Sequence, residues 1–162
     1  MKKFLLSIAT VFSIGAAQAQ IFLNEVYVQP SVNHHEFIEL FNAGTTPASS
    51  GCYTIITYFN DGTDYGFYVI DLPDVKIAAR SYLLASSEGT FNYQNGQAVA
   101  DVNWNLASNI TRYVYTNGSL QVDNTGAPYY DIFTRAAAPG GSKKGPYAIF
   151  LYDGSTLVDG LL

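Results

Sequence analysis

The stretch Glu36-Phe37-Ile38-Glu39-Leu40-Phe41-Asn42 decides the fold class of this chain of 162 residues. In an extended strand successive side chains point to opposite faces. Ile38 and Leu40 therefore face one way, and Phe37 and Phe41 face the other. Because both faces are partly apolar, we expect a strand that is covered on two sides or that lies at a corner.

Similar short runs, rich in Val, Ile, Tyr and Phe and separated by turn residues, lie on both sides of this stretch. The expected strands are 21–28, 36–41, 52–59, 66–72, 81–86, 112–115, 120–122, 129–133, 147–152 and 156–158. Asn117-Gly118 gives the strongest hairpin signal, and Asp153-Gly154 predicts a last hairpin. No helical stripe extends beyond a turn or two. The pattern favours an all-β sandwich or barrel.

The first nineteen residues are typical of an export signal. Lys2 and Lys3 precede the apolar run 4–16, which ends in Ala17-Gln18-Ala19. The run is shorter than the about 20 residues that a membrane-spanning helix needs. We expect cleavage after Ala19, a single domain over 20–162, no membrane span, and a secreted or cell-surface location.

The composition is acidic and poor in charge. Charged residues make up 13% of the chain, against about 25% in soluble domains. The net charge of −5 becomes −7 when the two lysines of the signal are removed, which argues against a nucleic-acid partner. Cys52 is the only cysteine, so no intramolecular disulfide forms, and we expect it to be buried as a small apolar residue.

Two motifs resemble the lamin-tail domain of bacterial exported proteins, including those of Bacteroidetes. They are an Asn-Glu strand start and the 36–42 stretch, which a proline-containing loop and a glycine follow. The residues that carry the resemblance are Asn24, Glu25, Glu36, Phe37, Glu39, Leu40, Asn42 and Gly51. It implies an immunoglobulin-like β-sandwich in which these residues are structural. Relative to that module, 89–145 is expected to be an irregular insertion and the C-terminus to be truncated.

The acids and amides of these motifs also suggest a metal site, because calcium prefers oxygen ligands. Glu36 and Glu39 are an odd number of residues apart and should point to opposite faces of their strand. We therefore expect Asn24, Glu39 and Asn42 to satisfy backbone groups at strand ends. A paired-carboxylate hydrolase stays open only if two acids face each other.

His34-His35-Glu36 looks like a metal motif, but adjacent strand residues diverge, whereas zinc needs three or four convergent ligands. No serine or cysteine has a histidine at an informative spacing. We therefore expect no metal, no cofactor and no catalytic residue.

The candidate ligand-binding residues are Trp104, Tyr113 and Tyr115. They lie in a stretch from residue 91 to residue 124 that holds seven asparagines. Exposed rings beside amide groups suit the recognition of sugars or extended polymers. The alternative is that the rings pack on strands, where aromatic residues are favoured anyway.

The sequence thus predicts a non-catalytic interaction or structural module of a surface or secreted bacterial protein, with a protein or polysaccharide partner. The alternatives are an accessory domain of an extracellular hydrolase or nuclease, and a carbohydrate-binding module. The strand edge at 158–162 is expected to lack a partner strand, which favours self-association.

Overall fold

The computed structural model describes residues 20–27, 36–60, 64–93, 96–106, 109–125, 127–130, 132–133 and 148–162. Within these ranges the chain is all-β and contains no helix. The strands are β1 (Ile21–Tyr27), β2 (Phe37–Asn42), β3 (Ala48–Ser49), β4 (Tyr53–Asn60), β5 (Tyr65–Asp71), β6 (Lys76–Ile77), β7 (Tyr82–Ser86), β8 (Thr90–Tyr93), β9 (Gly96–Val99), β10 (Val102–Asn103), β11 (Ile110–Thr116), β12 (Ser119–Val122), β13 (Ala148–Asp153) and β14 (Thr156–Leu161).

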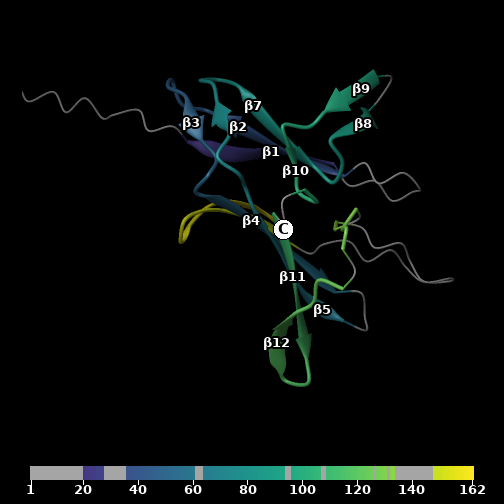
Figure 1. Ribbon diagram of the computed structural model, residues 1–162. Helices are drawn as coiled ribbons and strands as arrows, with labels where there is room; N and C mark the ends of the chain where they lie inside the picture. The colour runs from purple at the N-terminus through teal and green to yellow at the C-terminus, as the bar shows by residue number, and fades with distance from the viewer. Residues whose placement is uncertain are drawn as a thin grey trace, which may run out of the picture.

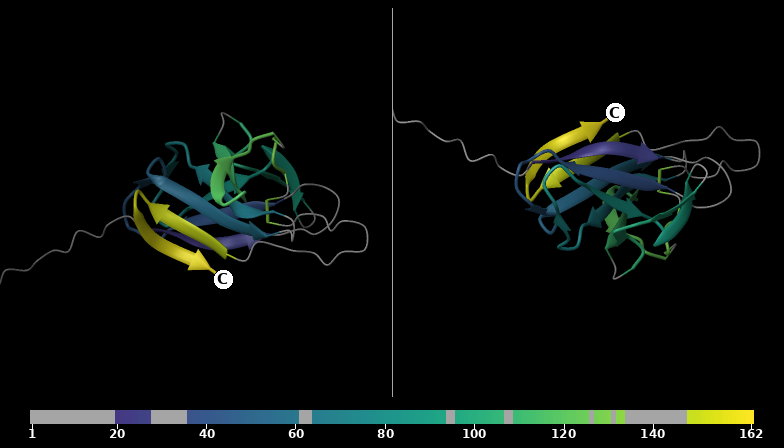
Figure 2. Two further views of the ribbon diagram at one scale, coloured as in Figure 1. Left: turned by 90° about the horizontal axis from the view of Figure 1, so that it is seen from below. Right: turned by 90° about the horizontal axis from the view of Figure 1, so that it is seen from above.

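Two sheets pack against each other as a β-sandwich (Figure 1). The smaller sheet has the order β1-β2-β7-β10, and the larger sheet has the order β12-β11-β5-β4-β13-β14. Two further strand pairs, β3–β6 and β8–β9, lie outside them. The C-terminal hairpin β13–β14 brings its outer strand beside β1, so the two sheets meet at these edges (Figure 2).

The core lies between the two sheets and follows the predicted alternation. Ile38 and Leu40 of β2 point into it, as do Ile55 of β4 and Ile70 of β5. Phe37 points to the other side of its sheet and stacks on Phe91 of the β8–β9 pair at 5.5 Å. The prediction that the 36–42 strand is covered on both sides is confirmed.

Both predicted hairpins are present. Asn117 and Gly118 join β11 to β12 with φ values of 52° and 79°, the left-handed conformation that two-residue hairpin turns require. Gly154, with a φ of 55°, joins β13 to β14. The edge at 158–162 belongs to β14, which among the described strands pairs with β13 alone, so within that part of the chain the prediction of an edge without a partner strand is confirmed.

Three expectations are wrong. The 89–145 stretch is not simply irregular, because it supplies five strands, β8 to β12, and β11 lies inside the larger sheet. The described residues of 129–133 form no strand; Tyr129, Ile132 and Phe133 pack into the core from irregular backbone. Cys52 is exposed, because it lies in the turn that precedes β4.

Candidate functional site

Glu36 is a structural residue that points into the protein interior. Its side chain is fully buried, and its Oε2 accepts hydrogen bonds from the backbone N–H groups of Ile132 at 2.6 Å and Phe133 at 2.9 Å. Glu39 lies on the outer side of β2, where its Oε1 accepts a hydrogen bond of 2.5 Å from the Asn24 side chain. The prediction that these two acids point to opposite faces is confirmed.

Asn42 satisfies backbone groups as predicted. It is fully buried, and its amide donates to the carbonyls of Thr46, Ile77 and Ala78, while its Oδ1 accepts from the N–H of Gly44. The same expectation is wrong for Asn24 and Glu39, because the Asn24 amide donates to the Glu39 carboxylate and the two side chains thus bond to each other.

Gly51 belongs to the same structural group as Asn42. An added Cβ there would lie 3.0 Å from the Asp74 Cβ, so the turn before β4 leaves little room for a side chain.

A bulge at Asn24 places two acids side by side. The register of β1 against β2 shifts between Leu23 and Glu25, so that Glu25 lies opposite Glu39 on the outer side of the smaller sheet. The Tyr93 hydroxyl donates to Glu25 Oε1 at 3.1 Å. Among the described residues no three His, Cys, Asp or Glu side chains converge as metal ligands would, and His34 and His35 lie outside those residues.

Trp104 is not an exposed ring. Its exposed fraction is 0%, its Nε1 donates to the Tyr129 carbonyl at 3.0 Å, and its ring meets Phe133 edge-on. The expectation that Trp104 offers a surface for a ligand is therefore wrong; the indole is a core residue with a satisfied donor.

Tyr113 and Tyr115 are accessible, and they lie on the outer side of the larger sheet. Tyr113 stacks on Phe67 with ring centroids 5.0 Å apart, and Tyr115 stacks on Tyr65 at 5.2 Å. Both partners come from the neighbouring strand β5, which sequence reasoning did not connect with them.

These rings belong to a wider surface, which we call the aromatic face. It comprises the outward side chains in the middle of β12, β11, β5, β4 and β13, namely Leu120, Val122, Thr111, Tyr113, Tyr115, Tyr65, Phe67, Val69, Ile56, Tyr58 and Phe150; the other outward side chains of these strands, Thr54, Asn60, Asp71, Ala148 and Tyr152, lie at its margins. Each of them is half-buried or exposed. A sheet with one face in water normally alternates apolar residues inward and polar residues outward. Here the outward positions are apolar too, and such a patch indicates an interaction surface.

The register organises the aromatic face into two parallel rows. Tyr113, Phe67 and Tyr58 lie side by side across β11, β5 and β4 and form a ridge of three rings. A second row lies two residues further along the strands and consists of shorter, β-branched side chains. We call this second row the step. The step consists of Thr111, Val69 and Ile56.

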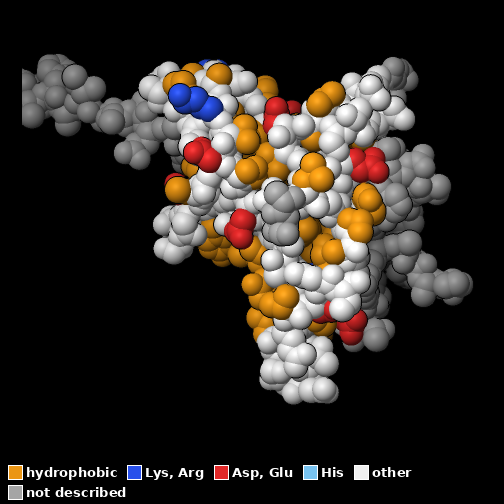
Figure 3. Space-filling view, in the orientation of Figure 1, with side chains coloured by type: hydrophobic (Ala, Val, Ile, Leu, Met, Phe, Trp, Pro, Cys, Tyr) orange, Lys and Arg blue, Asp and Glu red, His pale blue; other side chains and the backbone are white. Residues whose placement is uncertain are grey.

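The aromatic face carries no charged side chain. The nearest acid on the same side of the sheet is Asp71 at the end of β5, whose carboxylate accepts a hydrogen bond from the Thr54 hydroxyl at 3.0 Å. Figure 3 shows apolar side chains along the flank formed by the larger sheet, with basic side chains visible only at the opposite end of the molecule, near β3. The face therefore offers contact area but no electrostatic attraction.

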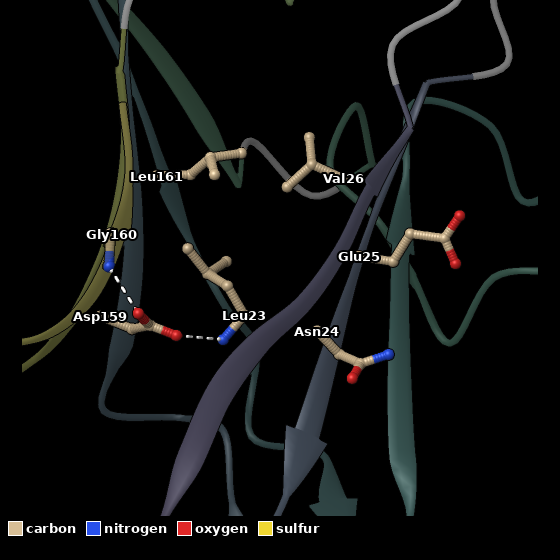
Figure 4. A pocket seen from close by; sticks show the side chains of 7 residues that line it. All are labelled: Leu23, Asn24, Glu25, Val26, Asp159, Gly160 and Leu161. Atoms are coloured by element: carbon tan, nitrogen blue, oxygen red, sulfur yellow. Dashed lines mark hydrogen bonds between the residues drawn. The ribbon is translucent and has the colours of Figure 1, made fainter.

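A groove of about 160 Å³ separates β1 from β14 (Figure 4). It is lined by Leu23, Asn24, Glu25, Val26, Asp159, Gly160 and Leu161. The Asp159 carboxylate accepts hydrogen bonds from the N–H of Leu23 in β1 and from the N–H of Gly160 in β14. This carboxylate thus occupies a backbone donor on each edge strand, which opposes the addition of another strand here.

A buried cation stabilises the loop after β12. Arg112 of β11 pairs with Asp123, and its guanidinium lies 4.9 Å from the centre of the Phe59 ring. Hydrogen bonds from the side chain and backbone of Thr125, together with Arg112, hold the pKa of Asp123 below its ordinary value. Since Asp123 already neutralises Arg112, we interpret this pair as structural.

No protein-family model and no curated protein matches this chain. Among the residues that the structure describes, none forms a helix long and apolar enough to cross a membrane.

Proposed function

We propose that this chain is a non-catalytic, exported interaction module that binds another protein through the aromatic face. The observation that carries the proposal is that apolar side chains line the outer side of the larger sheet. Two of them, Tyr65 and Tyr115, remain 43% and 41% exposed. Tyrosine supplies large contact area at low cost in conformational entropy, which is why it is enriched in protein interfaces.

The arrangement of the rings favours a protein over a polysaccharide. Tyr65 and Tyr115 are nearly parallel, with an interplanar angle of 26° at 5.2 Å, and Phe67 and Tyr113 are similar. If two neighbouring rings lay flat on the sheet, they would meet edge to edge and their centroids would be further apart than this. The rings of each pair therefore overlap face to face, and their edges point away from the sheet. A sugar ring needs a flat face on which to lie, whereas outward edges interdigitate with the side chains of another protein.

The proposal also includes that the domain is of the lamin-tail type and that the chain is exported. It is supported by the motif residues, since Glu36, Asn42 and Gly51 each have a structural reason for their identity. It is also supported by the signal pattern at residues 1–19. Secreted protein whose N-terminal sequence begins at Gln20 would agree with export, and protein retained in the cytoplasm would contradict it.

Site-specific cross-linking tests the binding surface. A photoreactive phenylalanine analogue is placed at Tyr115, and in a control variant at Tyr82, which is 52% exposed on the opposite sheet. We expect covalent adducts with protein from position 115 in the producing cell and none from position 82.

The contrary result would favour the carbohydrate-binding alternative. It consists of no protein adduct at position 115, together with cosedimentation of the chain with cellulose, chitin or peptidoglycan. Loss of that cosedimentation in a Tyr65→Ala/Tyr115→Ala variant would place the sugar on the same face.

A further inference from the structure

The aromatic face is complementary in shape to itself. The ridge of Tyr113, Phe67 and Tyr58 stands beside the step of Thr111, Val69 and Ile56, and both rows cross the same three strands. A two-fold axis lying in the plane of contact, parallel to the rows and midway between them, exchanges the positions of the two rows. The ridge of one copy then lies over the step of the other.

Charge also favours an identical partner. The chain has a net charge of −5, so two copies repel each other through most of their surfaces. The only acid on this side of the described part of β5 is Asp71 at the end of the strand, and the two-fold axis places it over the partner's Tyr65, so a second acidic copy approaches this face without like charges in contact. None of the side chains that make up the aromatic face is charged, so the face does not select a partner of opposite charge.

We infer that a second copy of this chain packs on the aromatic face, ridge over step, to form a two-fold symmetric dimer. This inference rests on the proposed function and names its partner. Sheets that pack face to face in this way keep their strands roughly aligned, with interdigitating side chains about 10 Å apart between sheets.

The area available predicts a weak dimer. From a strand spacing of about 4.8 Å and a rise of about 3.4 Å per residue, five strands and five residues along each strand give a face of roughly 24 Å by 17 Å. Each copy then covers about 400 Å², and the total of about 800 Å² is below the about 1,200 Å² of a standard interface, in the range of weak, transient complexes. We therefore expect a dimer whose population depends on concentration.

Sedimentation equilibrium of the purified chain measures this association. The variant Val69→Glu places a carboxylate at the centre of the step, under the partner's ridge, and is expected to weaken dimerisation at least tenfold. A polar outward residue is normal for a solvated sheet, so the fold should be kept. The matched control is Tyr82→Glu, which adds the same charge to the exposed outer side of the smaller sheet and should leave the association unchanged.

A second measurement tests the ridge-over-step register. Phe67 of one copy lies over Val69 of the other, so Val69→Lys and Phe67→Glu chains should each be monomeric but should associate when mixed. Association of the mixture at least tenfold tighter than that of either variant alone is expected.

Two results would overturn the inference. One is a dimer that Val69→Glu leaves intact, and the other is a wild-type chain that stays monomeric at the highest concentrations reached. If the monomeric chain still forms adducts with a different protein from position 115, the inference fails while the proposed function stands.

Discussion

Removing the carboxylate of Glu36 should release the 129–133 segment from the core. The side chain of Glu36 is fully buried, and its Oε2 is the acceptor for two backbone donors, the N–H groups of Ile132 and Phe133. Glu36→Ala leaves both donors inside the protein without this partner. Glu36→Gln keeps an acceptor oxygen on a side chain of the same shape, and therefore separates the loss of the carboxyl group from the loss of the acceptor.

The expected magnitude follows from the two hydrogen bonds. A buried donor left unsatisfied costs about 1–3 kcal/mol, so Glu36→Ala should lower the free energy of unfolding by about 3 kcal/mol or more. Glu36→Gln keeps an acceptor oxygen for the two N–H groups and should cost about 1 kcal/mol. Because domains are stable by only about 5–15 kcal/mol, the larger loss is easily measured.

Trp104 gives this experiment a built-in reporter. It is the only tryptophan, it is fully buried, and it contacts the same segment through the Tyr129 carbonyl and the Phe133 ring. Urea unfolding followed by tryptophan fluorescence yields the free energies. Under native conditions, Glu36→Ala should also shift the emission to longer wavelength, because loosening the segment admits water to the indole.

Glu39→Ala is the matched control. Glu39 lies on the same strand but on its outer side, where its carboxylate accepts a hydrogen bond from the Asn24 side chain at an exposed position. We expect a change within about 0.5 kcal/mol, as is usual for surface substitutions. A Glu36→Ala variant as stable as the Glu39→Ala variant, with unchanged emission, would refute the assignment of Glu36 as the anchor of the segment.

Two further predictions concern the larger sheet and the loop after β12. Gly66→Ala would place a Cβ 1.9 Å from the Tyr113 carbonyl oxygen and should cost about 2 kcal/mol or more in urea unfolding, whereas Gly96→Ala, which meets nothing within 4 Å, should be neutral. Nuclear magnetic resonance titration should find the pKa of Asp123 below 3.8, and Thr125→Ala should raise it towards that value. Because the pKa is lowered on folding, the contribution of Asp123 to stability is present above pH 3.8 and is lost as the pH falls through the lower folded value; an Asp123 pKa at or above 3.8 would contradict this account.

The sequence predicted the strands well, because alternation and turn chemistry are local. Ile38 and Leu40 reach the core as their spacing requires, and Asn117-Gly118 forms the turn that its positive φ values demand. Asn42 was expected to serve backbone groups, and it does so at a strand end. Its three carbonyl partners include those of Ile77, at the end of β6, and of Ala78, the next residue, and no local pattern indicates these distant partners.

Exposure was harder to predict, because it depends on contacts between distant segments. Trp104 looked accessible among asparagines, yet Tyr129 and Phe133 enclose it from a segment about 25 residues further along. Cys52 looked buried by residue type, but its position in a turn keeps it in solvent. Composition alone cannot distinguish a ring in a core from a ring on a surface.

The signal for the aromatic face was nevertheless present in the sequence, as a conflict with the expected pattern. In β4 the inward residues Ile55 and Phe59 alternate with Ile56 and Tyr58, so both faces of the strand are apolar. The β8–β9 pair covers the smaller sheet at Phe37 through Phe91 and Tyr93, and thus explains the second apolar side of β2 there. No described segment covers the corresponding side of β4, and the partner that we propose would account for its outward residues. Since folding alone needs one apolar side per strand, the second is best explained by association.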